Sequence, residues 1–383
     1  MVQYKGNLDR LEISDNMVSI IKIYIVFLNA IYILFKFNKS KKKVFFLSRQ
    51  GNSASIDYKL IIKELEKKYP TYEIVVMTKK IEKKPLTFFI KNNAILFKQM
   101  YHLSTSEICI IDGYNLSVSV LKHKKELKII QIWHALGGVK KFGSQIKEES
   151  KKMKINKALK QHENYDYIIT SSKKTKNIYQ EAFNYESNKI IEIGMPRIDY
   201  ILQSEKENKQ NIYKKYPEFK NKKIVLYAPT FRENNNYKIK ELINGFDEDY
   251  TIILKLHPAI KIDLSSLNNN IYTCKEFTSL EILSVADYII TDYSAFSIEA
   301  SLLNKKLYFY VYDYEEYLKK PGLNIDLYKY FNGYIYKQPK KIIEKIKQEE
   351  YDLNLVKKYR KDYVSNINED VTEKLVEFIM EEK

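Results

Sequence analysis

The regular alternation of short apolar runs with helical patterns is the feature that most constrains how this chain can fold. An apolar run at 44–48 precedes a polar turn, a helical pattern at about 56–68 and a second apolar run at 72–78. A strand–helix–strand unit of this kind builds a parallel sheet with right-handed crossovers. Further strands are expected at 108–112, 128–133, 167–170 and 190–193.

The same rhythm restarts after a lysine-rich helical stretch near 202–215. The strands expected beyond it are 223–227, 250–256, 271–273, 287–291 and 307–311. A length of 383 residues also suits two domains better than one core. We therefore predict an α/β protein with two doubly wound domains that face one another across a cleft. The predicted parts are a membrane-associating segment (1–43), an N-terminal domain (44–205) and a C-terminal domain with C-terminal helices (206–383).

An apolar run near the N-terminus, 17–37, almost reaches the length of a membrane span. Lys22 and Asn29 interrupt it, and a basic cluster of Lys36, Lys39 and 41–43 follows. This pattern favours a helix that lies in the membrane interface, with its lysines on anionic headgroups. A buried first helix and a true membrane anchor are the alternatives. Positive flanking charge predicts that the rest of the chain stays on the cytoplasmic face.

The charge balance points to anionic partners. Lysine and arginine number 65 against 48 acidic residues, which gives a formal net charge of +17. Nucleic acid, an anionic membrane or a phosphate-rich substrate would suit this surplus. The lysines are spread along the chain without a recognised nucleic-acid motif, so we expect no nucleic-acid partner. Cys109 and Cys274 have apolar neighbours and read as reduced core residues. The histidines form no metal-ligand pair with cysteine, so we expect no metal.

The segment 291–299 reads as a turn from a strand into a helix. Asp292 ends the strand, Ser294 is expected to be the N-cap of the helix, and Glu299 lies one turn further on. Free backbone N–H groups at such a helix start can bind an anion such as a pyrophosphate. A capped crossover helix without a ligand is the alternative.

Four other strand ends carry polar side chains suited to catalysis or to phosphate binding. Their residues are Trp133-His134 with Gly137, Gly138 and two lysines, then Arg197, then Thr230 with Arg232, and finally Lys255 with His257. An imidazole can accept a proton from a hydroxyl near neutral pH, and a second one can stabilise charge on a leaving phosphate. Arginine is suited to bidentate phosphate contacts, although an ion pair of Arg197 with Asp199 is equally plausible.

Taken together and in this order, the motifs WH…KK, GMPR.D, YAPTFR, LHP and ITDYS…E…LLN resemble those of the CDP-glycerol glycerophosphotransferases of teichoic acid synthesis. The resemblance covers about 44–330 and is closest to the short, primase-like members. It implies a glycosyltransferase-B-type (GT-B) fold of two Rossmann-like domains and peripheral attachment to the cytoplasmic membrane face. The implied reaction moves glycerol phosphate from CDP-glycerol to a hydroxyl of an undecaprenyl-linked acceptor and releases CMP. CDP-ribitol as donor, or a nucleotide-sugar glycosyltransferase of the same fold, is the alternative.

Position by position, the resemblance implies that His134 is the base for the acceptor hydroxyl. His257 would lie on the side of the pyrophosphate and the leaving CMP, and no cofactor or metal is implied. The other residues that it places at the substrates are Trp133, Gly137, Gly138, Arg197, Thr230, Arg232, Lys255, Thr278, Asp292, Ser294, Ala295 and Glu299. Among these, Ser294 would hold the pyrophosphate and Glu299 the cytidine ribose.

Three positions depart from the family pattern. The loop 135–140 after the first histidine is one residue longer than usual, which affects the shape of the acceptor side. Ala295 stands where a second serine is usual, although the backbone N–H that binds phosphate remains. The segment 318–323 is also altered, so the donor polyol or the acceptor can differ.

Overall fold

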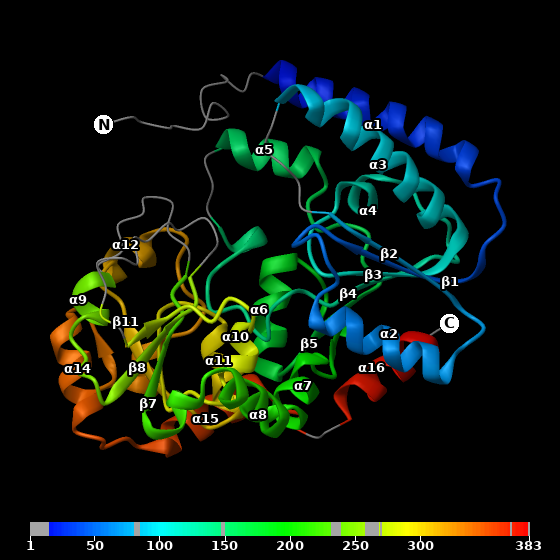
Figure 1. The fold of residues 1–383 in the computed structure, drawn as a ribbon. Helices are drawn as coiled ribbons and strands as arrows, with labels where there is room; N and C mark the ends of the chain where they lie inside the picture. The colour runs from blue at the N-terminus through cyan, green and yellow to red at the C-terminus, as the bar shows by residue number, and fades with distance from the viewer. Residues whose placement is uncertain are drawn as a thin grey trace. The chain divides into compact units, whose positions relative to one another are not determined.

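The computed structural model describes residues 15–79, 85–146, 150–230, 239–256, 268, 270–367 and 370–381. They form two six-stranded sheets, with strand orders β2-β1-β3-β4-β5-β6 and β12-β11-β10-β7-β8-β9 (Figure 1). The strands of the first sheet are β1 (Lys41–Ser48), β2 (Glu73–Thr78), β3 (Ser106–Ile111), β4 (Lys128–Gln131), β5 (Tyr167–Thr170) and β6 (Ile190–Glu192). Those of the second are β7 (Lys223–Tyr227), β8 (Tyr250–Leu254), β9 (Ile271–Tyr272), β10 (Tyr288–Thr291), β11 (Lys306–Tyr310) and β12 (Ile335–Tyr336).

Helices follow most of the strands. In chain order they are α1 (Asp15–Phe35), α2 (Ile56–Lys68), α3 (Pro85–Thr105), α4 (Leu116–Val120), α5 (Ser150–Ala158), α6 (Lys173–Phe183), α7 (Arg197–Gln203), α8 (Glu205–Lys215), α9 (Ile239–Ile243), α10 (Ser279–Ile282), α11 (Phe296–Leu302), α12 (Tyr314–Lys319), α13 (Leu327–Phe331), α14 (Pro339–Lys347), α15 (Leu353–Tyr363) and α16 (Val371–Glu381). Short 3₁₀ turns occupy Gly143–Gln145, Ser187–Lys189 and Pro217–Asn221.

The predicted parallel sheets are confirmed, because every strand pair with a described register is parallel. Helix 56–68 and strand 223–227 have the bounds expected from the sequence. The two-residue strand β12 was not predicted, because a run of two residues carries no readable periodicity.

By their contacts, the residues group into two compact units. Unit 1 holds 1–134, 147–168 and 379–383, and unit 2 holds 135–146 and 169–378, so the division passes through β5. Within unit 2, the hydroxyl of Ser171 donates to the Tyr363 carbonyl, which ties the segment after β5 to α15. The domain boundaries predicted from the sequence stay predictions.

Buried side chains on both faces hold the central strands in place, as expected for parallel sheets with helices on each side. Val44, Phe45 and Phe46 of β1 are fully buried. The buried Tyr58 of α2 donates its hydroxyl to the carbonyls of Leu47 and Ile110 at the carboxyl ends of β1 and β3. Helix α2 thereby fixes the carboxyl ends of β1 and β3, and β3 pairs directly with β4, the strand that precedes His134.

Helix α1 packs against the protein along one side only. It contacts α3 and α5, and Figure 1 shows it running alongside α3. Leu28 and Tyr32 are buried in this contact, and the Tyr32 hydroxyl meets Nδ1 of His123. The side chain of Asn29 donates to the Val120 carbonyl and accepts the N–H of Lys122. The polar residue inside the apolar run therefore docks the helix on unit 1.

The opposite side of α1 is apolar and exposed. Its exposed residues are Ile20, Ile23, Val26, Phe27, Ile33 and Leu34, and Phe37 follows the helix. The window Met17–Phe35 is long and apolar enough to cross a membrane by length and composition alone, and 17% of it is buried. A fully buried first helix, one alternative from the sequence, is wrong for these residues.

The basic cluster after α1 is only partly available at the surface. Lys39, Lys41 and Lys42 are exposed. Lys43 is buried within β1, where its ammonium donates to the Thr105 hydroxyl and lies 5.2 Å from the Tyr101 ring centre. Lys43 therefore cannot contact a headgroup, contrary to its place in the predicted cluster.

Replacing Asn29 by alanine tests how α1 is docked. The change leaves the Lys122 N–H and the Val120 carbonyl without this partner, so we expect the free energy of unfolding to fall by about 1–3 kcal/mol. Urea unfolding measures it. Asn38→Ala is the control, because the exposed Asn38 side chain bonds only to the nearby Phe35 carbonyl. Equal stability of the two variants would contradict the docking.

Candidate functional site

His134 of unit 1 follows β4, and its ring orientation is set by a backbone carbonyl. Its Nδ1 lies 2.9 Å from the carbonyl oxygen of Asp112, just beyond β3, and 3.2 Å from the side-chain amide of Gln50, just beyond β1. The carbonyl oxygen only accepts hydrogen bonds, whereas the amide nitrogen of Gln50 only donates them, so Nδ1 can serve one of the two contacts. The shorter contact, to the carbonyl, is the one made when Nδ1 carries the proton in the neutral ring. The other nitrogen, Nε2, then has the lone pair that a base needs.

Neighbouring strand ends support this histidine. Trp133 has a left-handed backbone (φ 60°), and its N–H donates to the Gln131 side chain at 2.8 Å. The Gln131 amide in turn donates to the Gly113 carbonyl at 3.2 Å. A Cβ on Gly113 would lie 2.9 Å from the Gln50 amide nitrogen, so only glycine lets Gln50 approach here.

A buried histidine lies on the other side of Trp133. The ring of His162 meets the Trp133 ring edge-on, with centroids 5.9 Å apart, and its Nδ1 lies 3.1 Å from the Tyr165 hydroxyl. Burial, and secondarily the nearby His134, lower the pKa of His162 to about 4. His162 is therefore neutral at physiological pH. Its ring packs against Trp133, whose ring also contacts that of His134.

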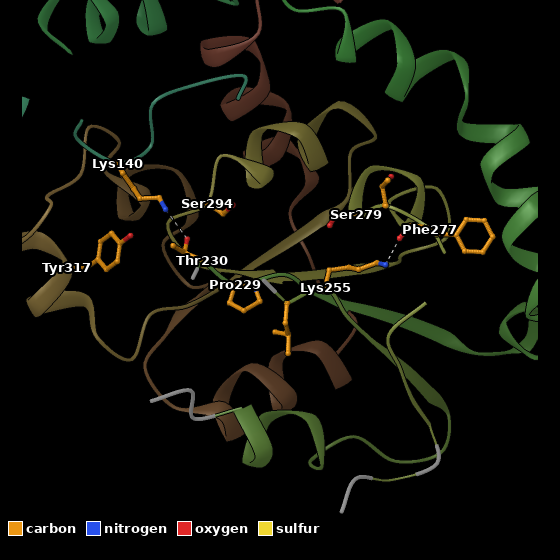
Figure 2. Close-up of a pocket in the computed structure, with 10 residues that line it drawn as sticks. Lys140, Pro229, Thr230, Lys255, Phe277, Ser279, Ser294 and Tyr317 are labelled. Carbon is orange, nitrogen blue, oxygen red and sulfur yellow. Dashed lines mark hydrogen bonds between the residues drawn. The ribbon is translucent and has the colours of Figure 1, made fainter. Parts of the chain in front are cut away.

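Unit 2 contains a separate pocket of about 770 Å³ at the carboxyl ends of its strands. It is lined by Lys140, Pro229, Thr230, Lys255, Leu256, Phe277, Thr278, Ser279, Ser294 and Tyr317. Figure 2 shows Lys140 and Tyr317 at one side, Lys255, Ser279 and Phe277 at the other, and Thr230 between them. Two lysines, several hydroxyls and two aromatic rings suit a ligand with both phosphate and ring parts.

One of these lysines shapes the pocket wall. The ammonium of Lys255 donates to the carbonyls of Cys274 and Phe277 (Figure 2 shows the second bond). Burial lowers the pKa of Lys255. Next along the wall, Thr278 caps α10 by accepting the N–H of Glu281, and the Glu281 carboxylate accepts the Thr278 N–H. Lys255 and Thr278 thus line the pocket and also hold its loop, and their predicted contacts with the substrates stay predictions.

The other lysine, Lys140, was not among the predicted site residues, although it is one of the two lysines that follow Gly137 and Gly138 in the first motif. Its ammonium lies 3.4 Å from the Thr230 hydroxyl. The amide of Asn324 donates to the carbonyls of Gly138 and Lys140, and Lys140 pairs with Leu323 in an antiparallel bridge. These contacts bring Lys140 to Thr230 in the pocket, and no local sequence pattern could have indicated them.

The turn after β10 supports the pocket mainly through its backbone. Both carboxylate oxygens of Asp292 accept the Thr230 N–H, at 2.9 and 3.0 Å. Ser294 lines the pocket, but the N-cap of α11 is Ala295, so the predicted cap is wrong by one residue. The Ser294 hydroxyl accepts the Phe296 N–H at 3.3 Å.

Arg197 and Glu299 are paired with each other. Arg197 Nη1 lies 2.5 Å from Glu299 Oε1, and both side chains are largely buried between α7 and α11. The Asp199 carboxylate does not pair with Arg197 in a described ion pair; it accepts the backbone N–H groups of Val371 and Thr372 at the start of α16. Neither Arg197 nor Glu299 lines the described pocket, and their predicted contacts with phosphate and ribose stay predictions.

Gly137 and Gly138 lie where neighbouring side chains leave no room for a Cβ atom. A Cβ on Gly137 would lie 2.6 Å from Ile298 Cδ1, and one on Gly138 would lie 2.9 Å from Ile178 Cγ2. Both residues are buried.

The predicted residues Arg232 and His257 lie outside the described residues. Within the described part of the chain, no group of three or more histidine, cysteine, aspartate or glutamate side chains is placed to hold a metal ion.

A parallel α/β fold with polar side chains and lysines at its strand ends is typical of enzymes that bind phosphate-bearing ligands. Comparison with known proteins makes this specific. The chain belongs to the CDP-glycerol:poly(glycerophosphate) glycerophosphotransferase family, whose model matches residues 29–381.

Two curated relatives and one solved structure illustrate the similarity. The chain is 34% identical to the teichoic acid glycerol-phosphate primase of Bacillus subtilis (strain 168), over 78% of this chain and 82% of the relative. It is 28% identical to the teichoic acid ribitol-phosphate primase of Bacillus spizizenii (strain ATCC 23059 / NRRL B-14472 / W23), over 88% of this chain and 90% of the relative. The structure of the wall teichoic acid polymerase TagF matches with a TM-score of 0.72 and 21% identity, covering 95% of this chain and 96% of that chain. The predicted fold class, GT-B-type with two Rossmann-like sheets, and the predicted family are confirmed.

The lowered pKa of His162 predicts that the protein loses stability in acid. In the unfolded chain the imidazole takes up a proton near its ordinary pKa of 6.5, whereas in the folded protein its pKa is about 4. The unfolded state therefore binds more protons between these values, and the free energy of unfolding falls as pH drops through 6.5. Urea unfolding at pH 7 and pH 5 should show that His162→Gln reduces this acid loss by about 1–3 kcal/mol. Gln161→Ala, at an exposed neighbour that does not titrate, is the control. An unchanged pH dependence in His162→Gln would contradict the lowered pKa.

Proposed function

We propose that this protein transfers glycerol phosphate from CDP-glycerol to a hydroxyl of a polyprenyl-linked teichoic acid, or related wall or capsule polymer, acceptor. Membership of the family supports the donor. The observation that carries the proposal is the hydrogen bond from Nδ1–H of His134 to the Asp112 carbonyl, because it leaves Nε2 as the acceptor of a proton.

In the proposed step, Nε2 of His134 takes the proton of the acceptor hydroxyl while that oxygen attacks the β-phosphorus of CDP-glycerol. A phosphodiester forms between the acceptor and glycerol phosphate. The bond from the β-phosphorus to the bridging oxygen breaks, and CMP leaves with that oxygen. His257 belongs to the CMP side of this proposal, and the transfer needs no metal in it. Positioning and charge stabilisation are the main requirements of such a step.

The pocket of unit 2 is the proposed donor site. Its volume of about 770 Å³ lies within the range of small-molecule sites. The ammonium of Lys140 and the hydroxyls of Thr230, Ser279 and Ser294 provide donors for phosphate oxygens. Phe277 and Tyr317 present rings that a base can stack on.

Replacing His134 by glutamine tests the base. Without the imidazole nitrogen, kcat should fall by roughly 10²–10⁴-fold, because that is the usual contribution of a general base. Release of CMP from CDP-glycerol with a lipid-linked acceptor measures it. The melting temperature and the calorimetric Kd for CDP-glycerol should stay at their wild-type values. Full transfer activity in His134→Gln would refute this mechanism.

The donor polyol has a direct test of its own. The two curated relatives named above are a glycerol-phosphate and a ribitol-phosphate primase, so both polyols must be compared. CDP-glycerol, CDP-ribitol and UDP-sugars are incubated separately with the protein and the acceptor. Preferential release of CMP from CDP-glycerol supports the proposal. Faster turnover of CDP-ribitol or of a UDP-sugar would replace it.

The proposal places the protein at the cytoplasmic face of the cell membrane, attached peripherally through α1. The exposed apolar side of α1 and the exposed lysines that follow it support this attachment. A lipid-linked acceptor would be reached from the same surface.

Introducing two negative charges on the exposed side of α1 tests this attachment. Ile23 and Val26 are 70% and 69% exposed, so Ile23→Asp/Val26→Asp should leave the fold intact. Sedimentation with phosphatidylglycerol vesicles should show wild-type protein in the pellet and this variant in the supernatant. Leu353→Asp, at an exposed apolar residue of α15, is the control and should still sediment. A double variant that stays bound would show that another surface makes the contact.

A further inference from the structure

Arg49 is a half-buried cation for which the described residues provide no salt-bridge partner. It directly follows β1, at the same sheet edge as His134. Its Nε is buried and has no hydrogen-bond partner in the structure. Its guanidinium carbon lies 5.9 Å from the centre of the Tyr114 ring. No salt bridge joins Arg49 to any residue that the structure describes.

The surroundings of Arg49 do not compensate this charge internally. Burial lowers the pKa of its guanidinium, and among the described residues Tyr114 opposes this effect. The nearby carboxylate of Asp112 accepts the Ser48 hydroxyl at 2.7 Å. A buried charge is costly unless it is paired, so a partner from outside the chain would relieve this cost.

Arg49 belongs to the same group of side chains as the proposed base. The next residue, Gln50, lies 3.2 Å from His134 Nδ1. The ring of Tyr114 meets His162 edge-on at 5.9 Å, and Trp133 connects His162 to His134. All of these residues lie in unit 1, at or just beyond the strand ends or in the segment before β5.

We infer that Arg49, with Tyr114 against it, is an acceptor-side site for a phosphate oxyanion carried by the acceptor itself. The inference rests on the proposed function, in which His134 touches the acceptor hydroxyl. We assign this phosphate to the acceptor because Arg49 and His134 belong to the same group of side chains in unit 1, whereas the residues of the proposed donor pocket all belong to unit 2. Guanidinium presents a fork of N–H donors that matches phosphate oxygens. The phosphate is either the lipid-linking diphosphate or a polyol phosphate already added to the acceptor.

The single tryptophan of the chain reports on this site without catalysis. Trp133 is the only tryptophan and lies within the same group of rings. Titration with inorganic pyrophosphate should change its fluorescence saturably in the wild type. Arg49→Gln should weaken this binding by about 10–100-fold, the usual effect of losing a charge-assisted hydrogen bond. Arg49→Lys should retain part of it, and the exposed Lys59→Gln should bind as the wild type does.

No fluorescence response in the wild type, or equal affinity in Arg49→Gln at an unchanged melting temperature, would overturn the inference. This readout also separates the two proposals. If the wild type releases no CMP, the proposed function is refuted. The pyrophosphate titration then still measures whether Arg49 binds an anion.

Three acceptors then identify the source of the phosphate. They are a disaccharide on a lipid diphosphate, the same disaccharide as a neutral alkyl glycoside, and that glycoside carrying one glycerol phosphate. Arg49→Gln should raise KM for whichever phosphate-bearing acceptor uses the site and leave KM for the neutral glycoside and for CDP-glycerol unchanged. An equal rise in KM for all three acceptors would contradict a phosphate site.

Discussion

All strands of a parallel sheet end on the same edge, and this constraint determines where polar side chains can meet in this protein. In unit 1, the residues after β1, β3 and β4 supply Gln50, the Asp112 carbonyl and His134. The hydrogen bond between Nδ1 and the Asp112 carbonyl orients the imidazole before any substrate arrives. Preorganisation of this kind means that little of the binding energy is needed to align the base.

The pocket of unit 2 also lies at the carboxyl ends of parallel strands, but its shape depends on contacts between residues that are far apart in the sequence. Asp292 after β10 holds the Thr230 N–H after β7, and Lys255 after β8 holds the loop that contains Cys274 and Phe277. Asn324 fixes the backbone near Lys140. Several polar residues of the motifs therefore act on the pocket by holding its walls, so replacing them should disturb geometry as well as direct ligand contacts.

Periodicity was enough to predict most of the fold, because buried parallel strands give continuous apolar runs that end in polar residues. It also placed His134, Thr230, Lys255 and Ser294 at strand ends. It could not predict that Arg197 pairs with Glu299, because about a hundred residues separate them and either side chain suits a phosphate or a ribose equally well. It also grouped Lys43 with surface lysines, since sequence spacing does not reveal the hydroxyl of Thr105 that accepts a hydrogen bond from its ammonium.

In the proposed mechanism, the hydrogen bond to the Asp112 carbonyl fixes the tautomer in which His134 can act as a base. Nitrogen NMR of protein with ¹⁵N-labelled histidine, assigned with His134→Gln, tests it at neutral pH. The account predicts a protonated Nδ1 and an unprotonated Nε2 for His134. A spectrum in which Nε2 carries the proton and Nδ1 does not would contradict it.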